Sequence, residues 1–523
     1  MAETKTKLTA LSKSPNRQSE ELFNTSREVK STHTSELVIA LCGPIGSPLH
    51  KVADTLRAIL TTEFGYDKCE ILRLSKIIEE YSKGEIIPSE QYAKVTKLIQ
   101  LGDDLRESYG SSILAELAVN KIVLDRQKAK ASAPKYEARR VCHIIDSIKN
   151  QEELDILRLV YRDMLYFIGV FSPMPIREKS LEKRGMSLTQ IYELIDKDSG
   201  EELAHGQTVR DTFPQADFFL RIDSDTDTQI KGKVERFLHL ILGTKIITPS
   251  PFETAMYQAA SAAGNSACLS RQVGAALTDE VGEVISVGWN DVPKAGGNLY
   301  TADPTSDPAG DADKRCWNLE GGTCFNDAEK NTISELLVSD LISKGLLDAS
   351  KKEEAVNRVI KNSKLKGLIE FSRAIHAEMH AIILGSQLGG TRVKNGKLFI
   401  TTYPCHSCAR HIIAAGIKEV YYIEPYRKSL ATKLHDDAIT ESETDARKVR
   451  ILPYDGVAPT RYLKLFRMQQ NSRKVNGKMP LIDFKTASPK FDKTLEALPT
   501  LEAIVVKGLQ AKHLIPEAAP NGE

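Results

Sequence analysis

The sequence lacks an excess of charge of either sign. Its 523 residues carry 71 Lys and Arg against 70 Asp and Glu, which gives a formal net charge of +1. A protein that binds duplex nucleic acid usually shows a basic excess or a basic stripe. Aromatic residues are also scarce, at 6% of the chain, and a groove for single-stranded nucleic acid needs rings on which bases stack. Both shortages disfavour a nucleic-acid-binding protein.

Long apolar runs and densely spaced cysteines are missing as well. No stretch approaches the roughly 18 uninterrupted apolar residues typical of a membrane-spanning helix. Residues 1–34 contain no apolar run, so we expect a polar, flexible tail rather than a signal peptide. Eight cysteines in a chain of this length do not build a disulfide scaffold. We therefore expect a cytoplasmic protein with no membrane partner.

Two α/β domains are predicted from what is present. A chain of 523 residues is too long for one typical domain. In the first region, 35–245, apolar runs with strand-forming residues alternate with helical patterns, which favours a mostly parallel sheet. The predicted strands of this region are 36–42, 141–146 and 165–171.

A second region, 250–475, begins after a linker at 243–251. Its predicted elements are a helix at 254–268, a strand pair at 272–277 and 284–289, a helix at 372–385, a strand at 397–402 and a helix at 405–416. A polar stretch rich in Gly and Pro, 293–323, predicts a long loop inside an insertion that we place at 293–370. The polar residues 480–523 are expected to form a loosely ordered tail.

The motif that carries the chemistry joins His376 and Glu378 with Cys405 and Cys408. This H-x-E…P-C-x-x-C pattern is the signature of zinc nucleobase deaminases. One imidazole and two thiolates supply three ligands and leave the fourth tetrahedral position of zinc to a water, whose pKa the metal lowers. Glu378 is expected to move protons from that water to the base and to the departing ammonia.

Each half of this motif has a more ordinary meaning when it occurs alone. A C-x-x-C pair can be a redox pair or half of a structural zinc site, and H-x-E is common by chance. A four-ligand structural site would need a further Cys or His, and the candidates are His380 and His406. We expect His380 to be packed or hydrogen-bonded and His406 to point away from the metal. The complete motif therefore predicts catalytic zinc.

The second region resembles the deoxycytidylate deaminase branch of the cytidine deaminase superfamily. The matching stretches are 270–276, 287–290, 376–378, 401–408, 411–416, 423–430 and 434–438. The resemblance spans about residues 250–470. It implies an αβα sandwich with a mixed five-stranded sheet, zinc between two helix N-termini, and conversion of dCMP or dCTP to dUMP or dUTP plus ammonia. It also implies a homo-oligomer whose neighbours complete each other's pockets.

Four further residues are candidate substrate contacts. By the resemblance Asn290 would meet the sugar, although its position equally suits an asparagine that caps a hairpin turn. Arg271, Tyr426 and Lys428 are candidate phosphate contacts, because a nucleotide needs cationic or hydroxyl donors near its base pocket. Each of these three could equally be a surface side chain.

The insertion contains Cys316 and Cys324, a C-x7-C pair. With another Cys or His supplied by the fold, this pair could hold a second zinc. Cysteines of this kind are more commonly free and buried, and both alternatives stay open.

The loop after the first predicted strand occupies the place of a phosphate loop. A working Walker A motif would need Gly and Lys where the chain has Pro48 and Leu49, so the motif is degenerate. Glycines still let backbone amides approach a phosphate. We therefore name Gly43, Gly46 and Ser47 as candidate nucleotide-binding residues and do not expect kinase or ATPase chemistry.

The first region also resembles the P-loop kinase-like domain that is fused to deoxycytidylate deaminases in bacterial anti-phage defence. The stretches that carry this resemblance are 101–110, 144–150, 171–177 and 184–185. It implies depletion of deoxycytidine nucleotides during infection, with regulation by a nucleotide or a small RNA. Two alternatives remain: a nucleotide-sensing defence or scaffold protein, and a deaminase of bases in nucleic acid.

Overall fold

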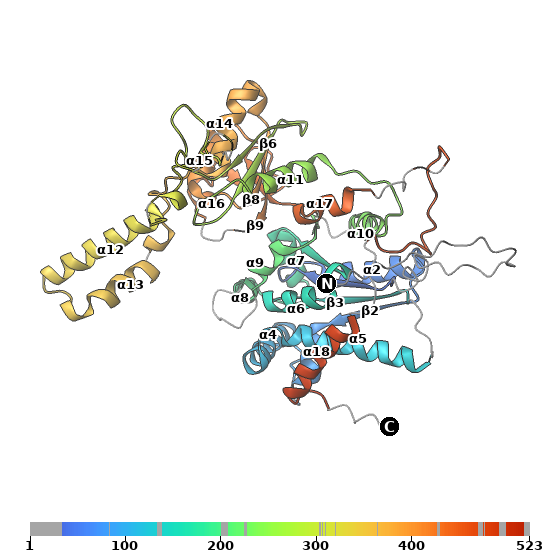
Figure 1. The fold of residues 1–523 in the computed structure, drawn as a ribbon. Coiled ribbons are helices and arrows are strands. Elements are labelled where there is room, and N and C mark those ends of the chain that lie inside the picture. Colours follow the sequence, from blue (N-terminus) through green and yellow to red (C-terminus); the bar gives the residue numbers. More distant parts are fainter. Residues whose placement is uncertain are drawn as a thin grey trace, which may run out of the picture.

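Two six-stranded sheets, each covered by helices, form the body of the protein (Figure 1). The computed structural model describes residues 34–516 except 83, 133–138, 200–207, 224–226, 303–304, 306, 309, 320, 363, 426–428, 469–473, 475 and 491–497. The predicted tail at 1–34 lies outside the described residues apart from Thr34. None of the helices within the described part has the length and hydropathy to cross a membrane.

The first sheet has the order β12-β5-β4-β1-β3-β2. Five of its strands are parallel, and the short β12 pairs antiparallel with β5. Every residue of β1 and β3 is buried, which explains why both strands are continuous apolar runs in the sequence. The strands are β1 (Leu37–Cys42), β2 (Lys68–Arg73), β3 (Val141–Asp146), β4 (Leu165–Phe171), β5 (Phe218–Arg221) and β12 (Gly456–Val457).

Helices cover both faces of this sheet. Leu37, Ile39 and Leu41 of β1 belong to a core shared with α2 and α10, and the alternate residues of β1 belong to a core shared with α3, α5 and α6. This alternation follows from the two-residue period of a strand. The helices of the first domain are α2 (Leu49–Thr62), α3 (Leu74–Tyr81), α4 (Gln91–Tyr109), α5 (Ile113–Ser132), α6 (Gln151–Tyr161), α7 (Met174–Glu182), α8 (Leu188–Ser199), α9 (Val209–Thr212) and α10 (Asp227–Leu242).

The second sheet is mixed, as the resemblance implied. Its order is β10-β11-β9-β8-β6-β7, with β6 antiparallel to both of its neighbours and the other pairs parallel. It has six strands rather than five, because the two-residue β10 adds to its edge. The strands are β6 (Gly274–Thr278), β7 (Val284–Trp289), β8 (Lys397–Thr402), β9 (Glu419–Glu424), β10 (Ile439–Thr440) and β11 (Val449–Pro453).

The helices of the second domain lie on opposite faces of this sheet. Buried residues of α14 (Ala377–Gly389) and α15 (His406–Ala414) share one core with the sheet, and those of α11 (Pro251–Ala263) contribute to the other. Helix α11 begins with a capping box between Ser250 and Glu253. The site described below lies where α14 and α15 begin.

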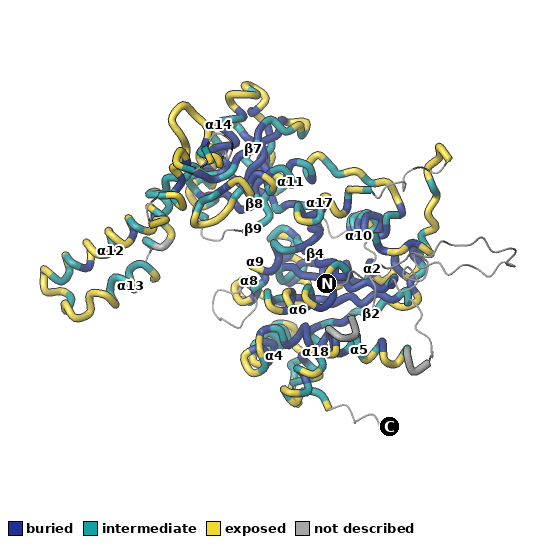
Figure 2. Tube along the Cα trace, in the orientation of Figure 1, coloured by how far each residue is buried: buried dark blue, intermediate teal, exposed yellow. Residues whose placement is uncertain are grey.

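The insertion forms a helical hairpin that projects from the body (Figure 1). Its helices are α12 (Phe325–Ser343) and α13 (Lys352–Asn362). Most of the hairpin is exposed or half-exposed (Figure 2), and α12 buries only a thin stripe that includes Ser334 and Val338. Such a narrow stripe leaves little apolar periodicity, which explains why no helix was predicted here.

The C-terminal segment differs from the expectation of a loosely ordered tail. Helix α18 (Leu498–Ala511) packs against α5 and α6 of the first domain, and its Val505 and Leu509 are buried in the core. Before it, Phe484 stacks on Phe64 with ring centroids 5.7 Å apart. The chain therefore returns from the second domain, through α17 (Pro459–Phe466), to the first. The contacts that order this segment are long-range, and its local polarity gave no sign of them.

Candidate active site

His376, Cys405 and Cys408 converge where two helices begin. His376 is the N-cap of α14, Cys405 is the N-cap of α15, and Cys408 lies in the first turn of α15. His376 Nδ1 is 3.2 Å from Cys408 Sγ and 3.5 Å from Cys405 Sγ. Helix α14 begins at Ala377 rather than at 372. It lies tightly on β7, since a Cβ at Gly288 would come within 2.5 Å of the Ala377 carbonyl oxygen.

These three side chains fit a zinc ion. The imidazole nitrogen and the two sulfurs lie within 4.8 Å of one another, and two thiolates with one imidazole are a donor set that zinc prefers. Hydrogen bonds with the Cys408 thiol and with His376 lower the pKa of Cys405 to about 4. The N-terminus of α15 also favours a thiolate there.

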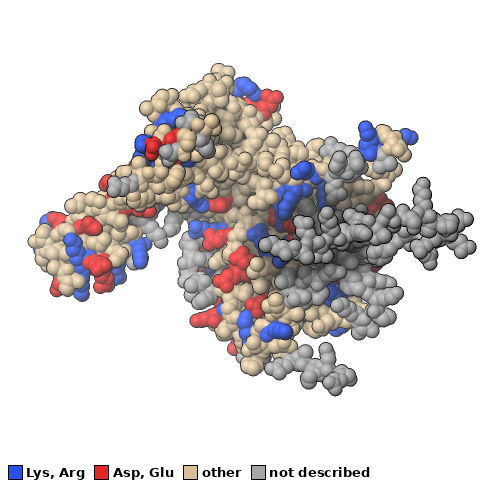
Figure 3. Space-filling model, in the orientation of Figure 1, with Lys and Arg blue, Asp and Glu red and all other residues tan. Residues whose placement is uncertain are grey.

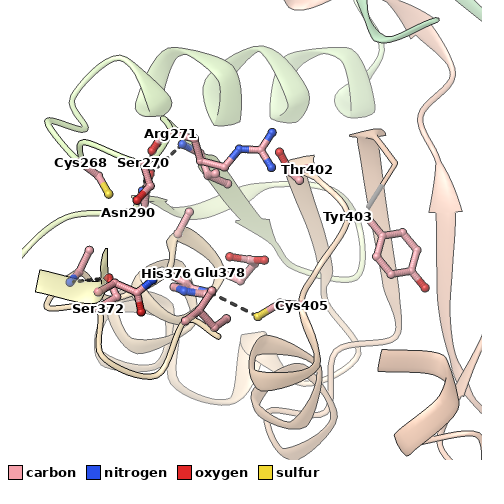
Figure 4. Close-up of a pocket in the computed structure, with 15 residues that line it drawn as sticks. Cys268, Ser270, Arg271, Asn290, Ser372, His376, Glu378, Thr402, Tyr403 and Cys405 are labelled. Atoms are coloured by element: carbon pink, nitrogen blue, oxygen red, sulfur yellow. Dashed lines mark hydrogen bonds between the residues drawn. The ribbon is translucent and has the colours of Figure 1, made fainter. Parts of the chain in front are cut away.

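Glu378 lies in the first turn of α14 beside these residues (Figure 4). Its side chain lines the same cavity as His376 and Cys405 but is only 4% exposed. Burial raises the pKa of its carboxyl group above the ordinary value. A carboxyl group beside a reacting water can take a proton from it and return the proton to another atom.

A cavity of about 300 Å³ extends from this cluster (Figure 4). Asn290 and Arg271, two of the predicted substrate contacts, line it. Asn290 Oδ1 accepts from the Val273 amide at 2.7 Å, and its Nδ2 donates to the Arg271 carbonyl at 2.9 Å. Asn290 therefore fixes the loop before β6 and keeps one N–H and one lone pair for a ligand.

The Arg271 side chain ends on a carboxylate. Its Nη2 is 2.6 Å from Oε2 of Glu424, which also accepts a hydrogen bond from Thr402. The pair is half-exposed at the cavity, so an anionic ligand could exchange with Glu424. The other two predicted phosphate contacts, Tyr426 and Lys428, lie outside the described residues.

The two histidines considered as additional ligands are engaged elsewhere. His380 Nδ1 accepts from the Trp289 amide at 3.2 Å, and its Nε2 is 3.1 Å from Asn298 Oδ1. This confirms that His380 is a hydrogen-bonded residue, and burial lowers its pKa. His406 is half-buried and faces Glu370 at 3.9 Å.

Cys316 and Cys324 are half-buried free thiols. Together with Cys268 they line a small cavity of about 20 Å³ beside the larger one. Among the described residues, the groups of three ligand atoms close enough to share a metal do not include these cysteines. The structure thus gives the second zinc no support.

Sequence reasoning missed the part that the insertion plays in the cavity. Asn326 of α12 and Ser372 line it together with Asn290. An isolated asparagine after a polar loop carries no local signal of such a role. The position of the first turn of α12, where Asn326 Nδ2 donates to the Leu368 carbonyl, brings Asn326 there.

The glycine loop of the first domain serves internal packing. A Cβ on Gly43 would lie 2.1 Å from the Val170 carbonyl oxygen, and Gly46 has a φ of +86°. The Ile45 amide donates to the Asp198 carboxylate at 2.7 Å, and the same carboxylate accepts from Lys149 at 2.7 Å. The Asp198 carboxylate therefore accepts the loop amide hydrogen bond that a bound phosphate would accept.

A separate cavity lies beside this loop, at the carboxyl ends of the parallel strands. It has a volume of about 360 Å³, and Gly46, Ser172, Lys179 and Lys183 are among its lining residues. Ser172 is fully buried, and within the described residues its hydroxyl has no hydrogen-bond partner. Ser47, the third residue named from the loop, is buried but does not line this cavity.

Comparison with known proteins finds sequences that are similar to the second domain. Residues 250–424 match the family described as the cytidine and deoxycytidylate deaminase zinc-binding region. ComE operon protein 2 of Bacillus subtilis is 46% identical over 56 residues, which are 11% of this chain and only 29% of that protein. The deoxycytidylate deaminase of Enterobacteria phage T2 is 29% identical over 168 residues, 31% of this chain and 74% of the phage protein.

A solved structure is also similar. The dCMP deaminase of cyanophage S-TIM5 in complex with dCMP and dUMP has 19% identity and a TM-score of 0.23, and the alignment covers 40% of this chain and 99% of that one. The matched family region contains His376, Glu378, Cys405 and Cys408. Residues 250–424 therefore form a domain of the cytidine and deoxycytidylate deaminase type.

Proposed function

We propose that this protein hydrolyses the 4-amino group of a deoxycytidine nucleotide, dCMP or dCTP, to give dUMP or dUTP and ammonia. One observation carries the proposal: a histidine and two cysteines lie close enough to share a metal ion, and His376, Cys405 and the buried Glu378 line a single cavity. The phage relatives bear the name deoxycytidylate deaminase, which supports a deoxynucleotide substrate.

Zinc held by His376, Cys405 and Cys408 would supply a Lewis acid. It would lower the pKa of water so that hydroxide is available as the nucleophile at neutral pH. Glu378 takes a proton from the attacking water and delivers it to N3 of the cytosine ring. Glu378 then takes the second proton of that water from the new C4 hydroxyl and passes it to N4. The C4–N4 bond breaks, ammonia leaves, and C4 keeps the oxygen of the water. The raised pKa of the buried Glu378 suits both directions of transfer.

The other end of the nucleotide would lie toward Asn290 and Arg271. We propose that the spare N–H of Asn290 binds the sugar and that a phosphate replaces Glu424 on Arg271. Tyr426 and Lys428 remain candidates for the same phosphate. A phosphate forms charge-assisted hydrogen bonds to an arginine as a carboxylate does, so this exchange keeps Arg271 paired.

The test is deamination of dCMP, dCTP, CMP, CTP and cytidine by purified protein with zinc content measured alongside. We expect turnover of the deoxynucleotides and its loss in Glu378→Gln, which keeps the size of the side chain but cannot move the proton. The control is Glu280→Gln, at an exposed turn of the same domain. Zinc-loaded protein that leaves all five substrates unchanged would contradict the proposal.

We extend the proposal to depletion of the deoxycytidine nucleotide pool in anti-phage defence by a homo-oligomer, on the strength of the sequence resemblance. A cell that expresses the wild type should lose dCTP after infection, and one that expresses Glu378→Gln should not. A protein that acts as a sensor or scaffold would protect equally in both forms. A base deaminase of nucleic acid is disfavoured, because the chain carries 71 Lys and Arg against 70 Asp and Glu. On the face drawn in Figure 3, the described Lys and Arg are scattered among Asp and Glu and form no large basic patch.

The first domain is proposed as the site of regulation, by a nucleotide or a small RNA. The observation that favours a phosphorylated ligand is the cavity with Lys179, Lys183 and the unpartnered Ser172 hydroxyl at the carboxyl ends of β1 and β4. Ligands of open α/β sheets bind at this edge. Isothermal titration with ATP, dCTP and dTTP, on wild type and Lys179→Ala, tests it, and absence of heat with all three would contradict it.

A further inference from the structure

Asn326 comes to the deaminase cavity from the insertion. It lies in the first turn of α12 and is 8% exposed, and it lines the cavity that also contains Asn290 and Glu378. It also lines the small adjoining cavity with Cys268 and Ser372, and His376, Glu378 and Cys405 do not border that second space. Asn326 therefore lies where the main cavity adjoins the small one.

The orientation of the Asn326 amide is fixed by one hydrogen bond. Its Nδ2 donates to the Leu368 carbonyl oxygen at 3.1 Å, so the other atom of the amide must be the oxygen. This Oδ1 is buried, and within the described part of the chain it has no hydrogen-bond partner. Buried acceptors are nearly always paired in folded proteins. A ligand that supplies a hydrogen-bond donor would complete it.

The chemistry of the substrate narrows the choice of donor. Phosphate oxygens and the O2 and N3 atoms of cytosine accept hydrogen bonds, so none of them can pair with Oδ1. A deoxycytidine nucleotide has two donors, the 4-amino group and the 3′-hydroxyl. The amino group is the leaving group and belongs beside Glu378, which does not border the small cavity that Asn326 also lines. The 3′-hydroxyl remains.

We propose that Asn326 Oδ1 accepts a hydrogen bond from the sugar 3′-hydroxyl, so that the insertion helps to select the substrate. The inference rests on the proposed deaminase function. With the spare N–H of Asn290 donating to the same oxygen, the hydroxyl both donates and accepts. Asn326 is then a specificity-determining residue, and its effect depends on the hydroxyl being present.

The experiment compares dCMP with 2′,3′-dideoxy-CMP on wild type, Asn326→Ala and Asn326→Ser. For dCMP we expect kcat/KM to fall about tenfold in each variant, as for the loss of one hydrogen bond that leaves a buried group unpaired. For the dideoxy substrate, wild type and variants should be equal. Asn331→Ala, on the exposed side of the same helix, is the matched control and should behave as wild type.

An equal fall for both substrates would overturn the proposal, because a structural role does not depend on the hydroxyl. No fall for dCMP would overturn it as well. Binding of both nucleotides to Glu378→Gln and to Glu378→Gln with Asn326→Ala, measured by calorimetry, separates the two hypotheses. If wild type does not deaminate but hydroxyl-dependent binding is lost with Asn326, the proposed function fails and the contact stands. If binding shows no such dependence, the contact fails.

Discussion

Glu253 joins the two domains through four hydrogen bonds. Arg236 of α10 donates to both carboxylate oxygens at 2.9 and 2.7 Å, and the backbone amides of Val457 and Ser250 donate at 2.9 and 2.7 Å. The side chain is 1% exposed. We predict that Glu253→Ala lowers the free energy of unfolding strongly, because one carboxylate holds a helix and a strand of the first sheet together with the start of α11.

The magnitude follows from these contacts. Removing one partner of a buried ion pair costs about 3–5 kcal/mol, and the lower end applies because the Arg236 side chain is 32% exposed. The buried Val457 amide loses its acceptor, which costs about 1–3 kcal/mol more. We therefore expect a loss of roughly 4–6 kcal/mol for Glu253→Ala. Glu253→Gln keeps one acceptor oxygen and should lose about half as much.

Urea unfolding followed by far-ultraviolet circular dichroism measures this loss. Glu280→Ala is the control, since Glu280 is exposed and its carboxylate is 3.9 Å from the Lys418 ammonium, so the side chain should contribute less than about 1 kcal/mol. A double-mutant cycle with Arg236→Ala should show coupling. A loss below about 1 kcal/mol for Glu253→Ala, or no coupling to Arg236, would refute the reasoning.

Three further predictions concern the metal, the glycine loop and the C-terminal helix. Dialysis against a chelator should abolish deamination and lower the melting temperature, and added zinc should restore both. In Cys408→Ser, added zinc should restore neither the activity nor the melting temperature. A metal-free protein that still deaminates would contradict the proposed zinc site. Asp198→Ala should free the Ile45 amide and Lys149, so that inorganic phosphate raises the melting temperature of the variant and not of the wild type. Leu509→Ala should cost about 2–5 kcal/mol in urea unfolding, because Leu509 is fully buried; a loss within error would mean that α18 does not add to the core.

The candidate metal ligands could be named from the sequence because each half of the motif is local. Cys405 and Cys408 lie within one helical turn, and His376 is the N-cap residue of the helix that carries Glu378. The spacing of each pair alone places its side chains together. The mixed sheet was implied by the resemblance to deoxycytidylate deaminases and not by local patterns, because strand periodicity alone does not say which strands run antiparallel.

The remaining features depend on contacts between distant parts of the chain. Asp198 meets the loop at Ile45, 153 positions earlier in the sequence, and no local pattern records that pairing. The sequence does not distinguish a glycine that close packing requires, such as Gly43, from a glycine that lets the backbone approach a phosphate. Asn326 likewise acquires its meaning only when α12 folds against the second domain. Sequence patterns identify reactive groups better than they identify the groups that fill or gate a site.

The return of the chain to the first sheet has a consequence for biosynthesis. Strand β12 and helix α18 belong to the first domain but follow the deaminase domain in the sequence. During synthesis the central strands of the first sheet therefore leave the ribosome long before β12 and α18. Until β12 is made, the backbone of β5 remains an unpaired sheet edge. The deaminase domain must form while its neighbour is unfinished. Severing the chain between the two domains would yield an incomplete first half rather than two autonomous proteins.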